Sequence, residues 1–250
     1  MHRILFKIGP VTIYTYGFFV FLGILVAYLF SLREAKREGV DTRVFSDILF
    51  WCLIIGFIGA RVLFIIVEFK SFLQTPFTIL FSRAGFVFYG GVISGLIGFY
   101  FLCHRYHQDF FKLADIIALS IPLGHSLGRW GCFFNGCCYG KPTTSWIGVK
   151  FPPDSPAGIL GEKVIPTQLI SSFFLLVIFF ILLNLRKRKK FKGEIFLSYL
   201  ILYGIFRFII EFFRGDPRGY IFIFSTSQFI SLIVVAIGIS MWKKVKGIHS

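Results

Sequence analysis

The chain has 250 residues, of which 56% are hydrophobic, and its mean hydropathy is +0.78. The apolar residues come in long blocks rather than at the periodic positions of a soluble core, which excludes a soluble globular domain and indicates a polytopic membrane protein. The net charge of +15 does not indicate nucleic-acid binding, because the Lys and Arg residues lie between the apolar blocks, where they act as topology signals.

Seven apolar blocks are long enough to cross the hydrocarbon layer, for which a helix needs about 20 residues. The fourth block is the weakest, because Pro122, His125 and Arg129 interrupt it. We therefore predict an all-α membrane protein with about seven transmembrane helices that forms a single domain over residues 1–250. The predicted segments are 12–31, 46–67, 85–103, 113–131, 168–185, 195–213 and 222–242.

The distribution of Lys and Arg between these segments predicts the orientation of the chain. One set of connections holds 15 of them, namely 32–45, 104–112, 186–194 and the C-terminal tail. The opposite set holds 9, namely the N-terminus, 68–84, 132–167 and 214–221. Because the side richer in Lys and Arg faces the cytoplasm, we expect the N-terminus outside and the C-terminus inside. The segment 132–167 is then an outward-facing loop, which we expect to carry part of a functional site.

Ionisable side chains inside the predicted helices gather at one depth. Arg61, Arg129, Arg207 and Glu211 all lie late in outward-running segments, and so fall in the outer half of the membrane. Such residues are costly in a bilayer and are candidates for function. Three arginines against one glutamate leave positive charge over, which is typical of a site that binds an anion such as phosphate.

Each of these residues also has a purely structural interpretation. Arg207 and Glu211 are spaced i, i+4 and could neutralise each other on one helix face. Arg61 and Arg129 could extend to the membrane interface, and Tyr14 and Tyr16 could belong to an interfacial belt of aromatic residues. The segment "YGGVISGLIG", which begins at Tyr89, has small residues at a spacing that favours close helix packing.

Three cysteines follow the fourth segment in the stretch "GRWGCFFNGCCYG", at residues 128–140. Their C-x4-C-C spacing differs from the C-x2-C pairs of zinc sites, and His125 offers a further ligand but no second pair is visible. We therefore predict that Cys132, Cys137 and Cys138 bind no metal. Two other interpretations stay open: a disulfide among the three in an outward compartment, or, favoured over it, small packing residues around a lipid pocket.

This stretch resembles the signature of the bacterial prolipoprotein diacylglyceryl transferase family. The resemblance extends in order and spacing from about residue 10 to 240, through "YTYG", "GARVLF", "FVFYGGVISG", "WIGVKFP", "IPTQL" and "RFIIEFFR". It implies an enzyme of the bacterial cytoplasmic (inner) membrane, with its active site toward the outer half of the bilayer. The implied reaction moves a diacylglyceryl group from phosphatidylglycerol to the lipobox cysteine thiol of a prelipoprotein, and glycerol phosphate leaves. It further implies no cofactor, no nucleic acid and a monomer.

The resemblance also assigns roles to residues. It implies catalytic roles for Arg129, Arg207, Glu211 and Tyr89, with the general base left open between Tyr89 and Glu211. The phosphatidylglycerol-binding residues that it implies are Arg61, Arg129, Asn135, Gly140, Tyr16 and Arg207. In addition, Gly128, Gly131, Gly136 and Gly140 are expected to let the headgroup approach the backbone and to leave N–H groups free for it.

This sequence departs from the family pattern at four positions. Tyr89 and Ile165 each replace a histidine, Cys132 replaces an asparagine and Cys137 replaces a glutamate. An alternative function is therefore a related membrane enzyme with a different phospholipid donor or acceptor. A non-enzymatic transporter or scaffold is a further alternative, which the lack of internal repeats disfavours.

Overall fold

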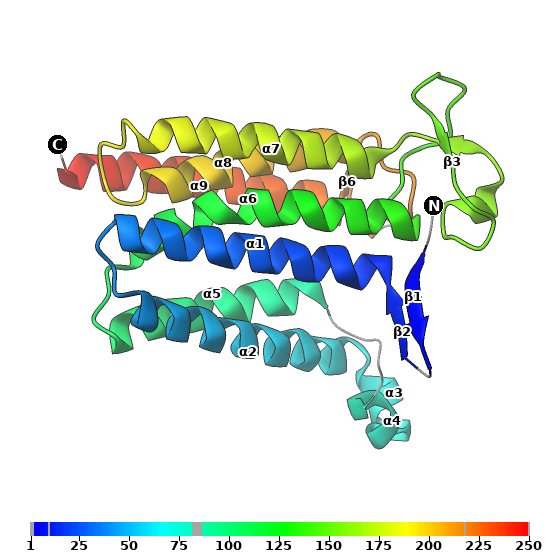
Figure 1. Cartoon of the computed structure of the whole chain (residues 1–250), viewed down its shortest axis with the longest axis horizontal. Coiled ribbons are helices and arrows are strands. Elements are labelled where there is room, and N and C mark those ends of the chain that lie inside the picture. Colours follow the sequence, from blue (N-terminus) through cyan, green and yellow to red (C-terminus); the bar gives the residue numbers. More distant parts are fainter. Residues whose placement is uncertain (1–2, 10, 82–86, 218, 250) are drawn as a thin grey trace. The chain divides into compact units, whose positions relative to one another are not determined.

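The computed structural model describes residues 3–9, 11–81, 87–217 and 219–249, and the described chain is mostly helical (Figure 1). Its helices and strands follow one another as β1 (Ile4–Ile8), β2 (Val11–Tyr14), α1 (Thr15–Arg37), α2 (Thr42–Val67), α3 (Phe69–Gln74), α4 (Pro76–Phe81), α5 (Phe88–Arg105), α6 (Phe110–Asn135), β3 (Val149–Lys150), η1 (Gly158–Leu160), β4 (Lys163–Val164), α7 (Thr167–Arg186), α8 (Glu194–Glu211), β5 (Tyr220–Ile221), β6 (Phe224–Ser225) and α9 (Thr226–His249).

Every predicted segment corresponds to one of the long helices, which are α1, α2 and α5 to α9. Among the described residues, five are long and apolar enough to cross a membrane: α1, α2, α6, α7 and most of α9. The molecule is thus a multi-pass membrane protein. The helices α5 and α8 are not among these five, and α8 includes three charged residues, Glu194, Arg207 and Glu211, within its 18 residues. The count of seven crossings and the orientation of the chain therefore stay predictions.

The structure adds elements that the apolar blocks did not predict. Three antiparallel hairpins, β1–β2, β3–β4 and β5–β6, lie between or before the helices. Two short helices, α3 and α4, occupy part of the connection 68–84. The weakest predicted segment forms a continuous helix, α6, that contains the buried Pro122 and runs to Asn135.

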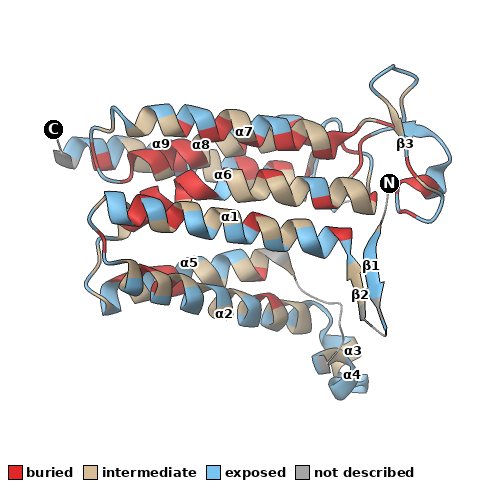
Figure 2. Ribbon diagram, in the orientation of Figure 1, coloured by how far each residue is buried: buried red, intermediate tan, exposed pale blue. Residues whose placement is uncertain are grey.

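Burial follows the pattern of a membrane protein (Figure 2). Large apolar side chains such as Phe21, Phe57 and Phe180 are more than half exposed, whereas Glu211, Arg214 and Gln168 are buried. Apolar side chains that face hydrocarbon lose nothing by exposure, so polar groups instead gather where other parts of the protein surround them.

Contacts divide the chain into two compact units, the first formed by Met1–Ser31 with Ala114–Ser250 and the second by Leu32–Leu113. In the second unit, α2 packs on α5 through small residues. A Cβ atom added at Gly59 would lie 2.9 Å from the Gly90 carbonyl oxygen, and the Ser94 hydroxyl donates a hydrogen bond to the Ile55 carbonyl at 3.1 Å. The helix-packing interpretation of the "YGGVISG" glycines is thereby confirmed.

In the first unit, α8 packs between α7 and α9 (Figure 1). A cluster of buried side chains joins α6, α7 and α8. The residues of α1 in this unit approach α6 at a pair of glycines. A Cβ atom at Gly23 would lie 2.4 Å from the Gly124 carbonyl oxygen, so the two backbones touch there and only glycine fits.

The start of α8 is fixed by a buried carboxylate from α6. The Asp115 carboxylate accepts hydrogen bonds from the backbone N–H groups of Gly193 and Phe196, each at 2.8 Å. The Lys189 ammonium group lies 3.3 Å from the same carboxylate. Asp115 therefore satisfies N–H groups that no helical carbonyl can reach, and its negative charge suits the positive end of the helix dipole.

Replacement of this carboxylate is expected to destabilise the fold. Asp115→Asn keeps the size of the side chain but turns one acceptor into a donor that faces an N–H group, so we expect the free energy of unfolding to fall by about 2 kcal/mol. Denaturant unfolding of the purified protein in detergent measures this. The control is Asp154→Asn, where the carboxylate is 69% exposed and the expected change is below about 1 kcal/mol. Equal stability of both variants would show that Asp115 does not hold α8.

Candidate functional site

Polar side chains of the first unit gather around the C-terminal ends of α6 and α8 and the N-terminal ends of α1, α7 and α9. The centre of this group is an ion pair on α8. Arg207 Nη1 lies 2.8 Å from Glu211 Oε2, and the two side chains are only 15% and 2% exposed. The i, i+4 pairing expected from the sequence is therefore present, in a largely buried setting.

Two serines near the start of α9 complete this pair. The Ser225 hydroxyl donates a hydrogen bond to Glu211 Oε1 at 3.0 Å, and Arg207 Nη2 donates one to the Ser227 hydroxyl at 2.9 Å. Both oxygens of the Glu211 carboxylate are thus engaged. Glu211 holds Arg207 in one orientation, while Ser225 holds Glu211.

Arg129, on α6, lies in the same region. The His125 imidazole, one turn earlier, is within electrostatic range of both the Arg129 and the Arg207 guanidinium groups. The Arg129 Nε atom is buried and makes no hydrogen bond with the part of the chain that the structure describes. Arg129 therefore keeps a donor available, and no carboxylate among the described residues forms an ion pair with it.

The end of α6 has a specific local structure. Gly136 has a left-handed conformation (φ 71°), and its N–H group donates to the Phe133 carbonyl at 3.1 Å, while the Cys137 N–H group donates to the Cys132 carbonyl at 3.2 Å. These two bonds form a Schellman motif, in which a glycine ends the helix and the side chains four residues before this glycine and one residue after it are brought together. Here those side chains are Cys132 and Cys137.

Cys138 completes a group of three thiols. The sulfur atoms of Cys132, Cys137 and Cys138 all lie within 4.8 Å of one another, and the three cysteines are free thiols. The turn that carries them is held from α7, because the Gln168 amide donates to the Cys137 carbonyl at 2.7 Å and the Thr167 hydroxyl donates to the Cys138 carbonyl at 2.8 Å.

The expectation that the signature glycines leave N–H groups free is wrong at two positions. The Gly136 N–H group is used in the Schellman motif, and the Gly140 N–H group donates to the Ile165 carbonyl at 2.9 Å. Gly140 is needed for close packing instead, since a Cβ atom there would lie 2.7 Å from Ile165 and 2.8 Å from the Phe213 carbonyl oxygen.

Other predicted residues of the first unit also lie here. The Tyr16 carbonyl oxygen packs against Gly131, where an added Cβ atom would lie 3.0 Å away, and the Tyr16 hydroxyl is within electrostatic range of Arg129 and the three cysteines. Asn135, the last residue of α6, interacts with the Cys137 thiol. The structure therefore brings together Tyr16, Arg129, Asn135, Gly140, Arg207 and Glu211.

Arg61 and Tyr89 belong to the second unit. Arg61 Nη2 donates hydrogen bonds to the carbonyl groups of Ile79 and Leu80, at 2.6 and 2.7 Å, and its guanidinium lies 5.6 Å from the centre of the Phe64 ring. It thus holds α4 against α2. Tyr89 is half-buried near the start of α5. These two residues are not part of the group that the structure describes around Arg207.

Sequence reasoning missed Arg214. Its guanidinium makes a two-pronged contact with the Asp216 carboxylate, at 2.8 Å for each bond, and its side chain is 2% exposed. It interacts electrostatically with the Cys138 thiol, and a β-bridge joins it to Gly140. The signal was its place in "RFIIEFFR", three residues after Glu211. Ser225 and Ser227 gave no such signal.

An apolar cavity of about 540 Å³ lies between α7 and α8, beside this polar group. Its walls include Phe174 on α7 and Phe206, Ile209, Ile210 and Phe213 on and after α8. Ile209 and Ile210, which line the cavity, directly precede Glu211 in the sequence of α8.

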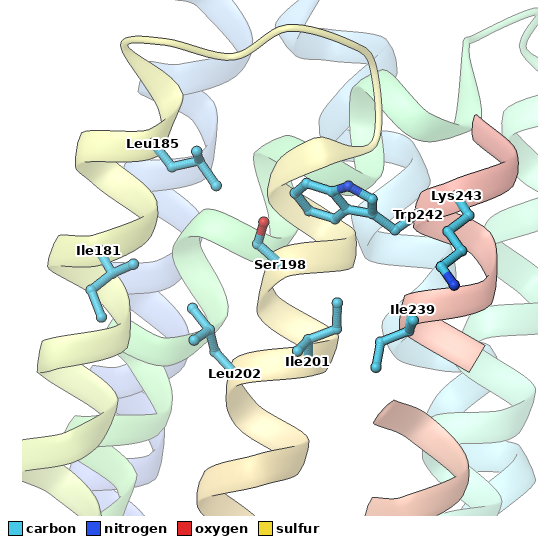
Figure 3. A pocket seen from close by; sticks show the side chains of 8 residues that line it. All are labelled: Ile181, Leu185, Ser198, Ile201, Leu202, Ile239, Trp242 and Lys243. Atoms are coloured by element: carbon cyan, nitrogen blue, oxygen red, sulfur yellow. The ribbon is translucent and has the colours of Figure 1, made fainter. Parts of the chain in front are cut away.

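A second apolar hollow, of about 440 Å³, lies among α7, α8 and α9 and is lined by Leu185, Ser198 and Trp242 among others (Figure 3). Ser198 precedes Glu211 by 13 residues on α8, which corresponds to about 20 Å along the helix. This hollow is therefore separate from the polar group.

Comparison with known proteins gives a consistent result. Residues 3–243 match the family described as "Prolipoprotein diacylglyceryl transferase". The chain is 40% identical over 240 residues to the phosphatidylglycerol–prolipoprotein diacylglyceryl transferase of Clostridium tetani, with 96% of each chain covered. It is 38% identical to a transferase of the same name from Clostridium perfringens, over 99% of this chain and 97% of that one. The corresponding Finegoldia magna protein is 35% identical, over 98% and 96%.

Proposed function

The chain belongs to the prolipoprotein diacylglyceryl transferase family, and we propose that Arg129, Arg207 and Glu211 form the centre of its active site. The protein is a transferase that moves a diacylglyceryl group from phosphatidylglycerol to the lipobox cysteine thiol of a prelipoprotein, with release of glycerol phosphate. The observation that carries the site proposal is the buried Arg207–Glu211–Ser225 chain beside Arg129.

The two arginines bind the phosphate of the donor lipid. A guanidinium binds phosphate through two parallel N–H donors, and both groups stabilise the negative charge that grows on glycerol phosphate as it leaves. Arg129 has no carboxylate partner among the described residues, so the phosphate supplies its counter-charge. Arg207 keeps its orientation through Glu211, whose role is therefore positioning.

The acyl chains of the donor occupy the apolar cavity between α7 and α8. The cavity runs along α8 as far as Ile210 and Phe213, so a lipid whose tails lie there presents its glycerol and phosphate to Glu211 and Arg207. Tyr16, Asn135 and Gly140 line the headgroup side, as the resemblance implied.

The attacking sulfur belongs to the prelipoprotein and must become thiolate-like. Of the two candidate bases, Glu211 is a weak one, since both of its oxygens are engaged by Arg207 and Ser225. Tyr89, on α5 of the second unit, is the other candidate that the resemblance left open. The surplus positive charge of Arg129 favours the thiolate and makes a strong base unnecessary.

The donor is tested directly with defined lipids. We expect the purified protein to convert a synthetic lipobox peptide to a product heavier by one diacylglyceryl group when phosphatidylglycerol is present, and to release glycerol phosphate. Mass spectrometry of the peptide measures this, and a peptide with serine in place of cysteine is the control. Conversion with another phospholipid but not with phosphatidylglycerol would instead support a different donor. That alternative arose because Cys132 and Cys137 replace an asparagine and a glutamate of the family pattern.

The enzyme works in the bacterial cytoplasmic membrane as a monomer with seven crossings, its N-terminus and active site on the outer side. We expect a cysteine introduced at Lys187, exposed after α7, to resist a membrane-impermeant thiol reagent in intact cells. A cysteine at Ser145, exposed between α6 and α7, is expected to react. The parent protein gives the background of its own cysteines. Reaction at position 187 but not at 145 would reverse the orientation.

A further inference from the structure

The three thiols at the end of α6 form a site that the family assignment does not require. Their sulfur atoms converge from two directions, Cys132 from the last turn of the helix and Cys137 and Cys138 from the turn after it. The Schellman motif explains why residues separated in sequence meet, and spacing alone could not show this.

The distances suit a single metal ion. A tetrahedral zinc ion with Zn–S bonds of about 2.3 Å places its sulfur ligands about 3.8 Å apart. The three sulfur atoms lie no more than 4.8 Å from one another, so side-chain rotation closes the remaining gap. A disulfide, by contrast, would draw two sulfur atoms to about 2 Å and leave the third without a role.

The surroundings favour thiolates. The Arg214 and Arg129 guanidinium groups lie within electrostatic range of the Cys138 thiol, and positive charge close to a thiol favours its thiolate form. A cation that binds at the point where the three sulfur atoms converge displaces the thiol protons. Three thiolates and a divalent cation carry one net negative charge, which suits a site within electrostatic range of the Arg214 guanidinium.

The site is also held in shape from outside. Gln168 and Thr167, both fully buried, hold the carbonyl groups of Cys137 and Cys138. Cys138 has a left-handed backbone conformation (φ 63°) that non-glycine residues rarely adopt, so the turn that carries its side chain has a specific shape. Such outer support is what orients the ligands of a metal site.

From this geometry we propose that Cys132, Cys137 and Cys138 bind one thiophilic cation of the Zn²⁺ class through three sulfur ligands. Thiolates select zinc and softer ions over magnesium or calcium. The proposal reverses the expectation drawn from the C-x4-C-C spacing. It does not depend on the transfer reaction, and its test needs no substrate.

The test uses Co²⁺ as a spectroscopic probe for zinc. Full-length protein is purified in detergent, reduced, freed of metal with a chelator and kept under inert gas. We expect Co²⁺ to produce sulfur-to-cobalt charge-transfer absorption that saturates at about one ion per chain and disappears on addition of Zn²⁺. A thiol assay shows that the cysteines are reduced before titration, and circular dichroism shows that the helices are intact.

Variants locate the ion. Cys137→Ser and Cys132→Ala are each expected to weaken Co²⁺ binding at least tenfold, and either variant serves if the other does not fold. Cys52→Ser and Cys103→Ser, which change the cysteines outside the cluster, are expected to bind as the parent does. Reduced, folded protein without the absorption would overturn the proposal. So would absorption that persists in both cluster variants, or a disulfide between two of the three cysteines in protein isolated from membranes.

Discussion

Arg129→Lys is expected to lower the rate of diacylglyceryl transfer about 100-fold while the amount of protein in the membrane stays unchanged. Lysine keeps the positive charge but loses the planar, two-pronged guanidinium. If Arg129 grips the departing phosphate through two N–H donors, the loss is on the order of 3 kcal/mol of transition-state stabilisation. Abundance is measured by immunoblot and transfer by conversion of the lipobox peptide.

The matched control is Arg188→Lys, which makes the same exchange at an exposed position between α7 and α8. This variant is expected to transfer at the parent rate. If Arg129→Lys also transferred within about threefold of the parent rate, Arg129 would act through its charge alone. The two-pronged contact would then have to be abandoned.

Arg207→Gln and Glu211→Gln separate a phosphate-binding role from a structural one. Each single change leaves the partner charge buried and unpaired, which destabilises a protein by several kcal/mol, so we expect both variants to be less abundant. The double variant removes both charges and is expected to recover abundance. Its transfer rate is nevertheless expected to stay about 100-fold below that of the parent, because the phosphate has lost one guanidinium.

A second ion pair on another helix provides the control. Arg37 and Glu34 on α1 lie 3.7 Å apart, and Arg37→Gln with Glu34→Gln is expected to leave the transfer rate per molecule unchanged. An Arg207→Gln/Glu211→Gln double variant with the parent rate would show that this pair serves only to neutralise charge. The phosphate proposal for α8 would then be wrong.

The long helices could be predicted from the sequence because each rests on a local property, a block of apolar residues. The i, i+4 pair Arg207–Glu211 could be predicted for the same reason, since helix geometry fixes such a pair. The hairpins could not, because a two-residue strand such as Tyr220–Ile221 has no pattern to detect. The partners of Glu211 were equally invisible, since Ser225 reaches it across a turn.

Local chemistry also contained a signal that went unused. Asn135-Gly136 at the end of an apolar block is a typical helix stop, and a glycine there implies a Schellman motif with its characteristic contact. Applied to "CFFNGC", that rule places Cys132 against Cys137. The expectation of free N–H groups at Gly136 and Gly140 is wrong for a different reason. A glycine has a wide choice of backbone conformations, but its N–H group can still be bonded, and here both groups donate to backbone carbonyls.

The contact between Gly23 and Gly124 has a consequence for positions far from any charge. Tyr16 meets Gly131 on the same pair of helices, and 16 to 23 and 124 to 131 are both steps of seven residues, or two helical turns. The two helices, α1 and α6, are therefore in close contact at two points, and these two contacts fix their alignment. A methyl group at Gly124 or at Gly131 would push α1 away at that contact, tilt it against α6 and move Tyr16 away from Arg129. The absence of a side chain at these glycines therefore sets how the ends of α1 and α6 that carry Tyr16 and Arg129 are aligned.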